Sequence, residues 1–279
     1  MVPDVIHFGQ GGKIVKIVRF KKGTKAQYGI VQKEKLFPCT GDPFKGMKES
    51  GKAMELNSVK LLAPVSPPNI ICLGLNYKKH VEECKYPTPA VPLLFFKTTT
   101  AVCGPGDPIV IPIHTPDKID YEVELAIVIG KKAKHVPLEE ASEYVLGYTV
   151  ANDVTNRGVQ FDDGQWARGK SYDTFCPIGP AIVTDLDGDN LNVTCRIDGK
   201  VMQASNTSDL IFSTRHLVSF ISDCMTLLPG TIILTGTPEG VGFTRQPPVF
   251  LQEGQVVECE IEGIGVLSNR VEREKQQKH

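Results

Sequence analysis

Short apolar runs recur along most of the chain, and their length and spacing are typical of β-strands. Runs of about four to eight apolar residues bounded by glycine, proline and polar turn residues indicate strands buried on at least one face. Such runs occupy residues 70–74, 93–97, 109–113, 120–130, 145–150, 178–184, 191–197, 231–235 and 255–261. The pattern therefore predicts a core built mainly from strands.

Helical periodicity is confined to two places. Pro137 suits a first helical position, and it precedes a short helix expected at 138–144. A longer helix is expected at 214–227, where Ser213 and Thr214 are candidate caps and one face is apolar. With so few helices beside so many strands, we expect an α+β protein with a large curled or mixed sheet.

The N-terminal part forms a smaller unit of its own. It contains two short strand candidates, 14–20 and 28–32, and it ends in the proline-rich stretch 62–69, which disfavours helix and internal strand pairing. We expect a small β-rich N-terminal domain at 1–62 and a main domain at 63–271. The charged residues 272–279 show no core pattern and are expected to form a disordered tail.

Two carboxylates interrupt one of the strongest strand patterns. Glu122 and Glu124 are two residues apart, so they point to the same face of a strand, about 7 Å apart along the chain. Asp153 follows the apolar run 145–150. Three carboxylates suit a hard cation such as Mg²⁺, with Mn²⁺ or Ca²⁺ as alternatives, and would leave coordination positions for a substrate. The competing interpretation is a charged strand edge whose glutamates are solvated.

His80 and Glu83 are three residues apart, so they share a face on any helical turn. A carboxylate that holds a histidine fixes its tautomer and stabilises its protonated form, which is a common way to build a general base near neutral pH. The two residues are therefore a candidate acid–base dyad. The competing interpretation is an ordinary surface pair.

Three further stretches have features of ligand-binding motifs. Residues 164–171 match the phosphate-binding pattern G-x-x-x-x-G-K-S of nucleotide hydrolases, but no buried strand precedes them. The acidic stretch 185–189 has its glycine in the wrong place for a calcium loop, and we expect a hairpin turn there. In 234–242 a strand runs into a glycine-rich loop. Its backbone amides and the Thr237 hydroxyl would be able to approach an anionic group closely. The competing interpretation is an ordinary strand-to-loop turn.

Composition narrows the classes of function. The 279 residues include 31 basic and 32 acidic ones, so the net charge of −1 gives no electrostatic footprint for nucleic acid or an anionic membrane, and we expect a small substrate. No apolar run approaches the ~20 residues of a membrane span. The eight cysteines form no CxxC pair and mostly lie in apolar runs, which favours a reducing compartment. With no presequence visible in this chain, we expect a cytoplasmic or mitochondrial-matrix protein.

Five motifs, taken together and in this order, resemble the fumarylacetoacetate hydrolase superfamily. They are CLGLNYKKH at 72–80, YEVEL at 121–125, NDVTNR at 152–157, GKS at 169–171 and LTGTP at 234–238. The resemblance covers residues 62–271. The chain departs from the family pattern at 95–98, where FFKT stands in place of Phe-x-Lys-Pro, and residues 1–60 contain no identifiable counterpart of the extra aspartate ligand of the larger fumarylacetoacetate hydrolases.

The resemblance implies a mixed β-roll fold, a homodimer and a metal-dependent active site. It implies that Glu122, Glu124 and Asp153 bind Mg²⁺ or Mn²⁺. It also implies that His80 and Glu83 are the acid–base dyad on a lid that closes over the substrate. Lys170 is similar to a family lysine beside the metal, which would stabilise an enolate or oxyanion. The residues that match positions lining the family's substrate pocket are Arg157, Gln160 and Thr237.

These expectations describe an enzyme that acts on a small 2-oxo or enol carboxylate through a metal-stabilised enolate. Its first candidate reactions are keto–enol tautomerisation of oxaloacetate and C–C hydrolysis of an acylpyruvate. Decarboxylation of oxaloacetate, and decarboxylation or isomerisation of dioates from aromatic catabolism, form the alternative. Nucleotide hydrolysis is a remote alternative, and a metal-stabilised protein without catalytic activity is the remaining class.

Overall fold

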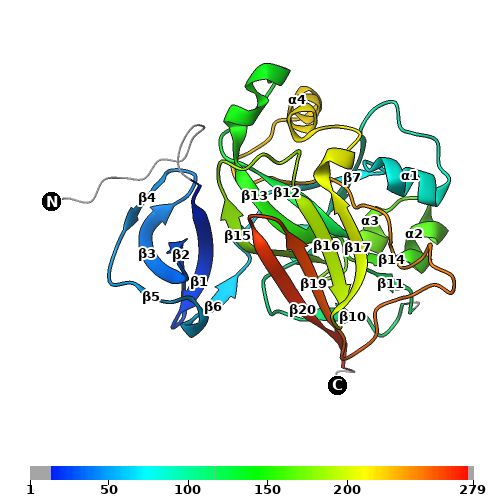
Figure 1. Ribbon diagram of the computed structural model, residues 1–279, viewed down its shortest axis with the longest axis horizontal. Coiled ribbons are helices and arrows are strands. Elements are labelled where there is room, and N and C mark those ends of the chain that lie inside the picture. The colour runs from blue at the N-terminus through cyan, green and yellow to red at the C-terminus, as the bar shows by residue number, and fades with distance from the viewer. Residues whose placement is uncertain (1–13, 116, 276–279) are drawn as a thin grey trace.

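The computed structural model describes residues 14–115 and 117–275, in which two packed sheets form the body of the molecule (Figure 1). The larger sheet has thirteen strands, and three of them lie off its main path. The main path is, in spatial order, β4 (Gly46–Glu49), β3 (Lys35–Asp42), β2 (Lys25–Gln32), β1 (Lys16–Lys22), β15 (Cys176–Val183), β13 (Val145–Asn152), β12 (Val123–Ile129), β18 (Ile232–Leu234), β7 (Ile70–Gly74) and β8 (Leu93–Lys97). The three strands off this path are β5 (Met54–Glu55), β6 (Lys60–Leu62) and β9 (Val102–Cys103).

The second sheet has five strands and packs against the middle of the first. Its spatial order is β10 (Ile109–Ile111), β20 (Gly265–Arg273), β19 (Val256–Ile261), β16 (Asn192–Ile197) and β17 (Lys200–Asn206). A short ladder of β11 (Ile119–Asp120) and β14 (Thr155–Asn156) stands apart. Most strand pairs among the described residues are antiparallel, but three are parallel: β18 with β7, β10 with β20, and β9 with β15. This mixed, sheet-dominated architecture confirms the predicted fold class.

Strand β12 lies at the centre of the core, and every one of its residues is buried. Val123, Leu125 and Ile127 belong to the hydrophobic cluster on one face of the sheet, and Ala126 and Val128 belong to the cluster on the other. A strand covered on both faces has no solvent side, which explains its nearly continuous apolar sequence. A charged residue on this strand must therefore find its partners inside the protein.

The helices are short and lie at the edges of the sheets (Figure 1). The longest of those described, α4 (Thr214–Cys224), ends three residues before its predicted end, and Leu227 instead forms a bridge with Ala133. Its predicted cap is confirmed, since the Ser213 hydroxyl accepts a hydrogen bond from the His216 N–H. The helices are α1 (Lys78–Cys84), α2 (Arg157–Asp163), α3 (Ala167–Lys170), α4 (Thr214–Cys224) and the 3₁₀ helices η1 (Leu56–Ser58), η2 (Thr99–Ala101), η3 (Leu138–Tyr144) and η4 (Thr207–Asp209).

Two sequence-based expectations about the chain's organisation are wrong in detail. Glu272 and Arg273, placed in the disordered tail, form the end of β20 and pair with Val110 and Ile111 of β10; residues 276–279 of that segment lie outside the described residues. The stretch 185–189 is not a hairpin turn, because the strand before it belongs to the larger sheet and the strand after it to the five-stranded one. Within the described residues, every helix is too short or too polar to span a membrane.

Candidate active site

The three predicted metal ligands converge where β12 and β13 meet. The two strands pair in antiparallel register with Val123 opposite Asn152, so Glu122 and Asp153 extend the pairing by one residue. The Asp153 N–H donates to the Glu122 carbonyl at 2.8 Å, and Glu124 lies within β12. One carboxylate oxygen from each residue lies within 4.8 Å of the others. Strand register thus brings together acids that are about thirty positions apart in the sequence.

All three carboxylates are inside the protein. Glu122 is 4% exposed, Glu124 1% and Asp153 0%, so the interpretation as a solvated strand edge is wrong. Lys170 donates to the Glu122 carboxylate at 2.6 Å and to the Asp153 carboxylate at 2.7 Å. Lys97 donates to the other Asp153 oxygen at 2.5 Å and to the Val154 carbonyl at 3.1 Å. Buried charges need this kind of direct pairing to be tolerated.

Arg157, at the start of α2, completes the arrangement from the other side. Its guanidinium donates to Asp120 at 2.8 Å, to Glu122 at 2.5 Å and to the Gln160 side-chain oxygen at 2.9 Å. Asp120 is fully buried and also accepts from the Gly242 N–H at 2.7 Å. We refer to the seven charged residues as the buried charge network: Lys97, Asp120, Glu122, Glu124, Asp153, Arg157 and Lys170.

Glu122 and Glu124 respond to this network in opposite ways. Burial favours the neutral form of Glu122, but Arg157 and Lys170 outweigh burial and lower its pKa below the usual range. Burial and the charges of Asp153 and Glu122 raise the pKa of Glu124 well above its usual range. A divalent cation bound by the three oxygens would offset that repulsion, and an all-carboxylate donor set is the one that hard cations prefer. The residues present therefore fit a metal ion.

The LTGTP motif supplies a backbone donor to Glu124. The Gly236 N–H lies 2.7 Å from its carboxylate, at a residue whose φ of +100° favours glycine. Thr237 is 4% exposed, donates its hydroxyl proton to the Val123 carbonyl at 3.0 Å and accepts from Gln203 at 2.8 Å. The strand-to-glycine-loop segment thus holds the β12 carboxylate in place.

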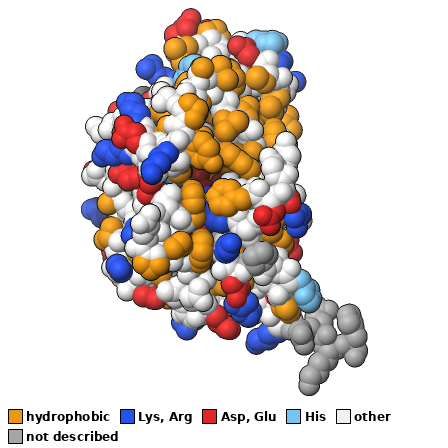
Figure 2. Space-filling model, turned by 90° about the vertical axis from the view of Figure 1, so that its right-hand side faces the viewer, with side chains coloured by type: hydrophobic (Ala, Val, Ile, Leu, Met, Phe, Trp, Pro, Cys, Tyr) orange, Lys and Arg blue, Asp and Glu red, His pale blue; other side chains and the backbone are white. Residues whose placement is uncertain are grey.

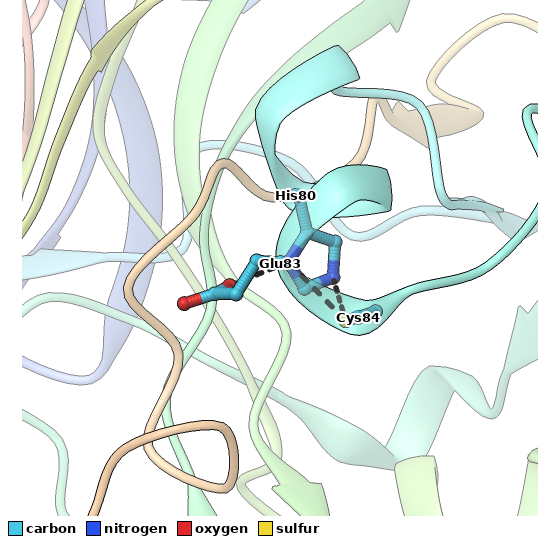
Figure 3. A group of neighbouring side chains, drawn as sticks. All are labelled: His80, Glu83 and Cys84. Carbon is cyan, nitrogen blue, oxygen red and sulfur yellow. Dashed lines mark hydrogen bonds and ion pairs between the residues drawn. The ribbon is translucent and has the colours of Figure 1, made fainter.

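His80 and Glu83 lie on one face of α1, as their spacing predicts (Figure 3). The His80 Nδ1 atom is 3.2 Å from a Glu83 oxygen, and His80 is 6% exposed, so the interpretation as an ordinary surface pair is wrong. The other Glu83 oxygen accepts from the Gly240 N–H at 3.0 Å and from the Thr244 hydroxyl at 2.9 Å. Burial raises the pKa of Glu83, but the hydrogen bonds from His80, Thr244 and Gly240 lower it by more, so Glu83 is held as a carboxylate.

A cavity of about 330 Å³ unites the dyad with the buried charge network. Hydrophobic side chains gather around a hollow on the face of the molecule that carries α1, α2 and α3 (Figure 2). The polar side of the cavity is lined by His80, Glu122, Glu124, Arg157, Gln160, Lys170 and Thr237. The apolar side is lined by Leu73, Leu75, Cys84, Tyr86, Leu93, Phe95, Phe161, Trp166 and Phe243. Every predicted site residue lines this cavity except Asp153, which is fully buried, and Glu83, which pairs with the cavity-lining His80.

The segment 164–171 does not have the geometry of a phosphate-binding loop. It follows helix α2 rather than a strand, and its last turn is the four-residue helix α3. Lys170 is buried and engages two carboxylates, so it is not directed toward a phosphate. This geometry argues against the nucleotide-hydrolase alternative.

Lys97 and Asp120 belong to the site but were not identified as site residues from the sequence. Each stands at the end of a predicted strand, where a charge is ordinarily solvated. The available signal was context: Lys97 closes an apolar run and Asp120 opens the acidic one. Their partners lie 56 and 37 positions away in the sequence, so the spacing of the residues does not predict which ones form ion pairs.

Comparison with known proteins settles the family. The model of the fumarylacetoacetate (FAA) hydrolase C-terminal family matches residues 69–272, and an Rv2993c-like N-terminal model matches residues 15–64. The chain belongs to the fumarylacetoacetate hydrolase family. It is an enzyme of that family, and the metal-ligand cluster described above lies inside the matched region.

Related sequences and structures cover most of the chain. The oxaloacetate tautomerase Fahd2a, mitochondrial, of Rattus norvegicus is 47% identical over 77% of this chain and 70% of its own length. An uncharacterised protein of Methanocaldococcus jannaschii, MJ1656, is 50% identical over 79% of this chain and 93% of its own length. The crystal structure of a 2-hydroxyhepta-2,4-diene-1,7-dioate isomerase from Mycobacterium marinum superposes with a TM-score of 0.84 at 38% identity, covering 94% of this chain and 100% of that one.

Proposed function

We propose that the protein is a divalent-metal-dependent enzyme that acts on a small 2-oxo or enol carboxylate, with keto–enol tautomerisation of oxaloacetate as its first activity. The observation that carries this proposal is the cavity lined by Glu122 and Glu124 of the buried carboxylate trio and by His80 of the histidine–glutamate dyad. Relatives named oxaloacetate tautomerase, at 46% to 47% identity, support the choice of reaction.

Glu122, Glu124 and Asp153 would hold the cation, with Mg²⁺ first and Mn²⁺ or Ca²⁺ as alternatives. A bound divalent cation supplies a Lewis acid that stabilises negative charge on substrate oxygens. Lys170 and Lys97 hold the carboxylates in place through direct hydrogen bonds, so the donor set is organised before a substrate arrives. Their positive charge also makes the site less negative toward an anionic substrate.

His80 is the group proposed to move the proton. Its Nδ1 faces Glu83, so Nε2 is the nitrogen left to take a proton from the carbon beside the keto group. The same proton, delivered to the enol oxygen or returned to the carbon, completes a tautomerisation without change in the number of atoms or electrons. Glu83 is a positioning residue, since its other oxygen is fixed by Gly240 and Thr244.

The remaining polar residues would orient the substrate. Arg157 retains guanidinium N–H groups beyond its three observed bonds, and these suit a substrate carboxylate. Because Gln160 accepts from Arg157 through its oxygen, its NH₂ group is left to donate. The Thr237 hydroxyl already donates to a carbonyl, so it is free only to accept, as from an enol hydroxyl.

The apolar side of the cavity favours a second candidate reaction, the C–C hydrolysis of an acylpyruvate. Tyr86, Phe161 and Phe243 form part of this wall, and Phe161 meets Phe243 edge-on with ring centroids 5.4 Å apart. The basic residues that line the cavity, Arg157 and Lys170, each already engage two carboxylates. An apolar tail would therefore fit the outer part of the cavity better than a second carboxylate does.

A substrate panel tests this proposal. Oxaloacetate, acylpyruvates of increasing tail length and unsaturated dioates would be incubated with Mg²⁺ or with a chelator, and products would be followed by absorbance and NMR. We expect turnover of oxaloacetate tautomers that the chelator abolishes. Turnover that survives complete metal removal would contradict metal dependence, and a preference for long apolar acylpyruvates would make the second reaction the main one.

Two further expectations stay predictions. A homodimer is proposed from the family resemblance, and sedimentation analysis of the purified chain would test it. A cytoplasmic or mitochondrial-matrix location is proposed from the cysteine usage, and localisation of the tagged full-length protein would test it.

A further inference from the structure

Helix α1 presents three different kinds of metal ligand on one face. His80, Glu83 and Cys84 are spaced i, i+3 and i+4, so their side chains meet beside one another (Figure 3). One ligand atom from each of the three lies within 4.8 Å of the others. The proposed reaction uses His80 and Glu83 but gives Cys84 no task.

The separations between these atoms are those of ligands around one small ion. Tetrahedral zinc with Zn–S near 2.3 Å and Zn–N or Zn–O near 2.0 Å puts sulfur roughly 3.5 Å from nitrogen, and nitrogen roughly 3.3 Å from oxygen. The Cys84 sulfur lies 3.7 Å from His80 Nε2 and 3.8 Å from Nδ1. The His80 Nδ1 atom lies 3.2 Å from the Glu83 oxygen. With Nδ1 as the one ring nitrogen that binds, the separations of 3.2 Å to the Glu83 oxygen and 3.8 Å to the Cys84 sulfur lie within about 0.3 Å of the tetrahedral values.

We propose that His80, Glu83 and Cys84 form a second metal site, which takes a borderline or soft divalent cation such as Zn²⁺ or Cd²⁺ and thereby inhibits the enzyme. The inhibition rests on the proposed function, because it follows from occupying the histidine that moves the proton. The binding itself does not depend on that function.

Ligand chemistry separates this second site from the carboxylate trio. A thiolate and an imidazole favour zinc-like ions, whereas Mg²⁺ and Ca²⁺ favour sites made of oxygen alone. The two clusters therefore select different metals, although both are reached from the same cavity, which His80, Cys84, Glu122 and Glu124 all line. Excess Mg²⁺ would fill the trio without competing for the thiol.

Binding converts the thiol to a thiolate. The ion displaces the S–H proton to solvent, and a metal–sulfur bond replaces the S–H bond. Burial raises the pKa of Cys84 to about 12, and the Glu83 charge adds to the effect. A thiol that stays protonated reacts slowly with oxidants, so Cys84 is poorly suited to an oxidation switch, and a bound ion must displace its proton against this raised pKa.

Co²⁺ is a spectroscopic probe for direct binding, because its thiolate complexes have a strong near-ultraviolet charge-transfer absorption. The full-length protein, saturated with Mg²⁺, would be titrated with Co²⁺ alone. We expect the band in the wild type and in Cys224→Ser, whose cysteine is exposed on α4, and its loss in Cys84→Ser and Cys84→Ala. Melting temperatures would verify that each variant is folded. A band unchanged in both Cys84 variants would overturn the site.

Zn²⁺ titration of activity at excess Mg²⁺ tests the inhibition. Each variant is compared with its own zinc-free rate. We expect the Zn²⁺ concentration for half-inhibition to rise at least roughly tenfold in Cys84→Ser and to stay unchanged in Cys224→Ser. Cobalt binding at Cys84 without zinc inhibition would overturn the regulatory half of the proposal. If the zinc-free wild type turned over no oxo acid, the proposed function would be refuted, and the cobalt band would still decide the metal site.

Discussion

The buried charge network and the α1 cluster of His80, Glu83 and Cys84 both contribute side chains to the same cavity but hold their charges in different ways. The carboxylate trio of the network lies where the central strands β12 and β13 meet, its basic residues come from β8, α2 and α3, and lysine or arginine pairs directly with each of its acids except Glu124. In the α1 cluster, Glu83 is held by neutral donors from Gly240 and Thr244 and by His80. Apart from Glu124, each acid of the network is thus balanced by a buried lysine or arginine, whereas the α1 cluster contains a histidine that can take up and release a proton. This difference suits one region to hold a cation and the other to do proton transfer.

The largest expected effect is that of Glu124→Ala. Glu124 forms no ion pair among the described residues, and its raised pKa shows that its charge is repelled in the fold. We expect Mg²⁺ binding, measured by calorimetry, and turnover to be lost together, while the metal-free variant melts at the same temperature as the wild type or higher. Glu139→Ala, at an exposed glutamate, is the matched control. A variant that keeps its affinity for Mg²⁺ would remove Glu124 from the metal site.

His80→Ala should separate the two regions. Among the described residues, His80 forms no hydrogen bond or ion pair with the network, so Mg²⁺ binding should be preserved. We expect kcat to fall by roughly 10²–10⁴-fold through loss of the general base. His135→Ala is the control, because His135 forms a comparable pair with Asp223 at 3.2 Å but is exposed. Equal turnover by wild type and His80→Ala would exclude the dyad from the mechanism.

Lys97→Met tests whether the network is held together by direct pairing. Lys97 and Asp153 are both 0% exposed, and removal of one partner leaves a buried charge short of compensation. We expect a loss of roughly 3–5 kcal/mol in the free energy of unfolding, measured by urea denaturation. The matched control is Lys35→Met, which breaks the exposed pair with Glu55 and should cost less than about 1 kcal/mol. Losses of similar size in the two variants would mean that burial of the pair is unimportant.

Much of this fold follows from local sequence pattern. Strands β7 and β8 have the predicted limits, and the limits of β13, β16 and β19 differ from the predicted ones by one or two residues. Strand β12 lies inside the predicted run 120–130. The carboxylate trio could also be anticipated, because the period of two within a strand and the apolar run before Asp153 are both local features. Local geometry predicted the trio but left the solvated-edge interpretation open, and only the burial of the three carboxylates excludes that alternative.

The remainder depends on contacts between distant segments. Lys97 and Asp120 each sit at a strand end, and only the packed sheet shows that they are buried and paired. Helix α2 was not predicted, since its buried face is formed by Arg157 and Gln160, whose polarity hides the helical pattern. The stretch 185–189 was predicted as a hairpin because its sequence is turn-like, but partner choice between sheets cannot be read from a turn.

The smallest expected effect comes from Asp163→Asn, which tests an ion pair outside both regions. Arg168 donates to the Asp163 carboxylate at 2.6 Å on the exposed α2–α3 segment, and this hydrogen bond lowers the pKa of Asp163. A lowered pKa stabilises the fold above the unfolded value of about 3.9, and that contribution is lost as the pH falls through the lower folded value. Thermal melts should therefore show a slight deficit for Asp163→Asn at pH 7 that disappears in strong acid. A deficit at pH 7 comparable to that of Lys97→Met would show that exposure does not weaken such pairs, and the contrast between buried and exposed charge would fail.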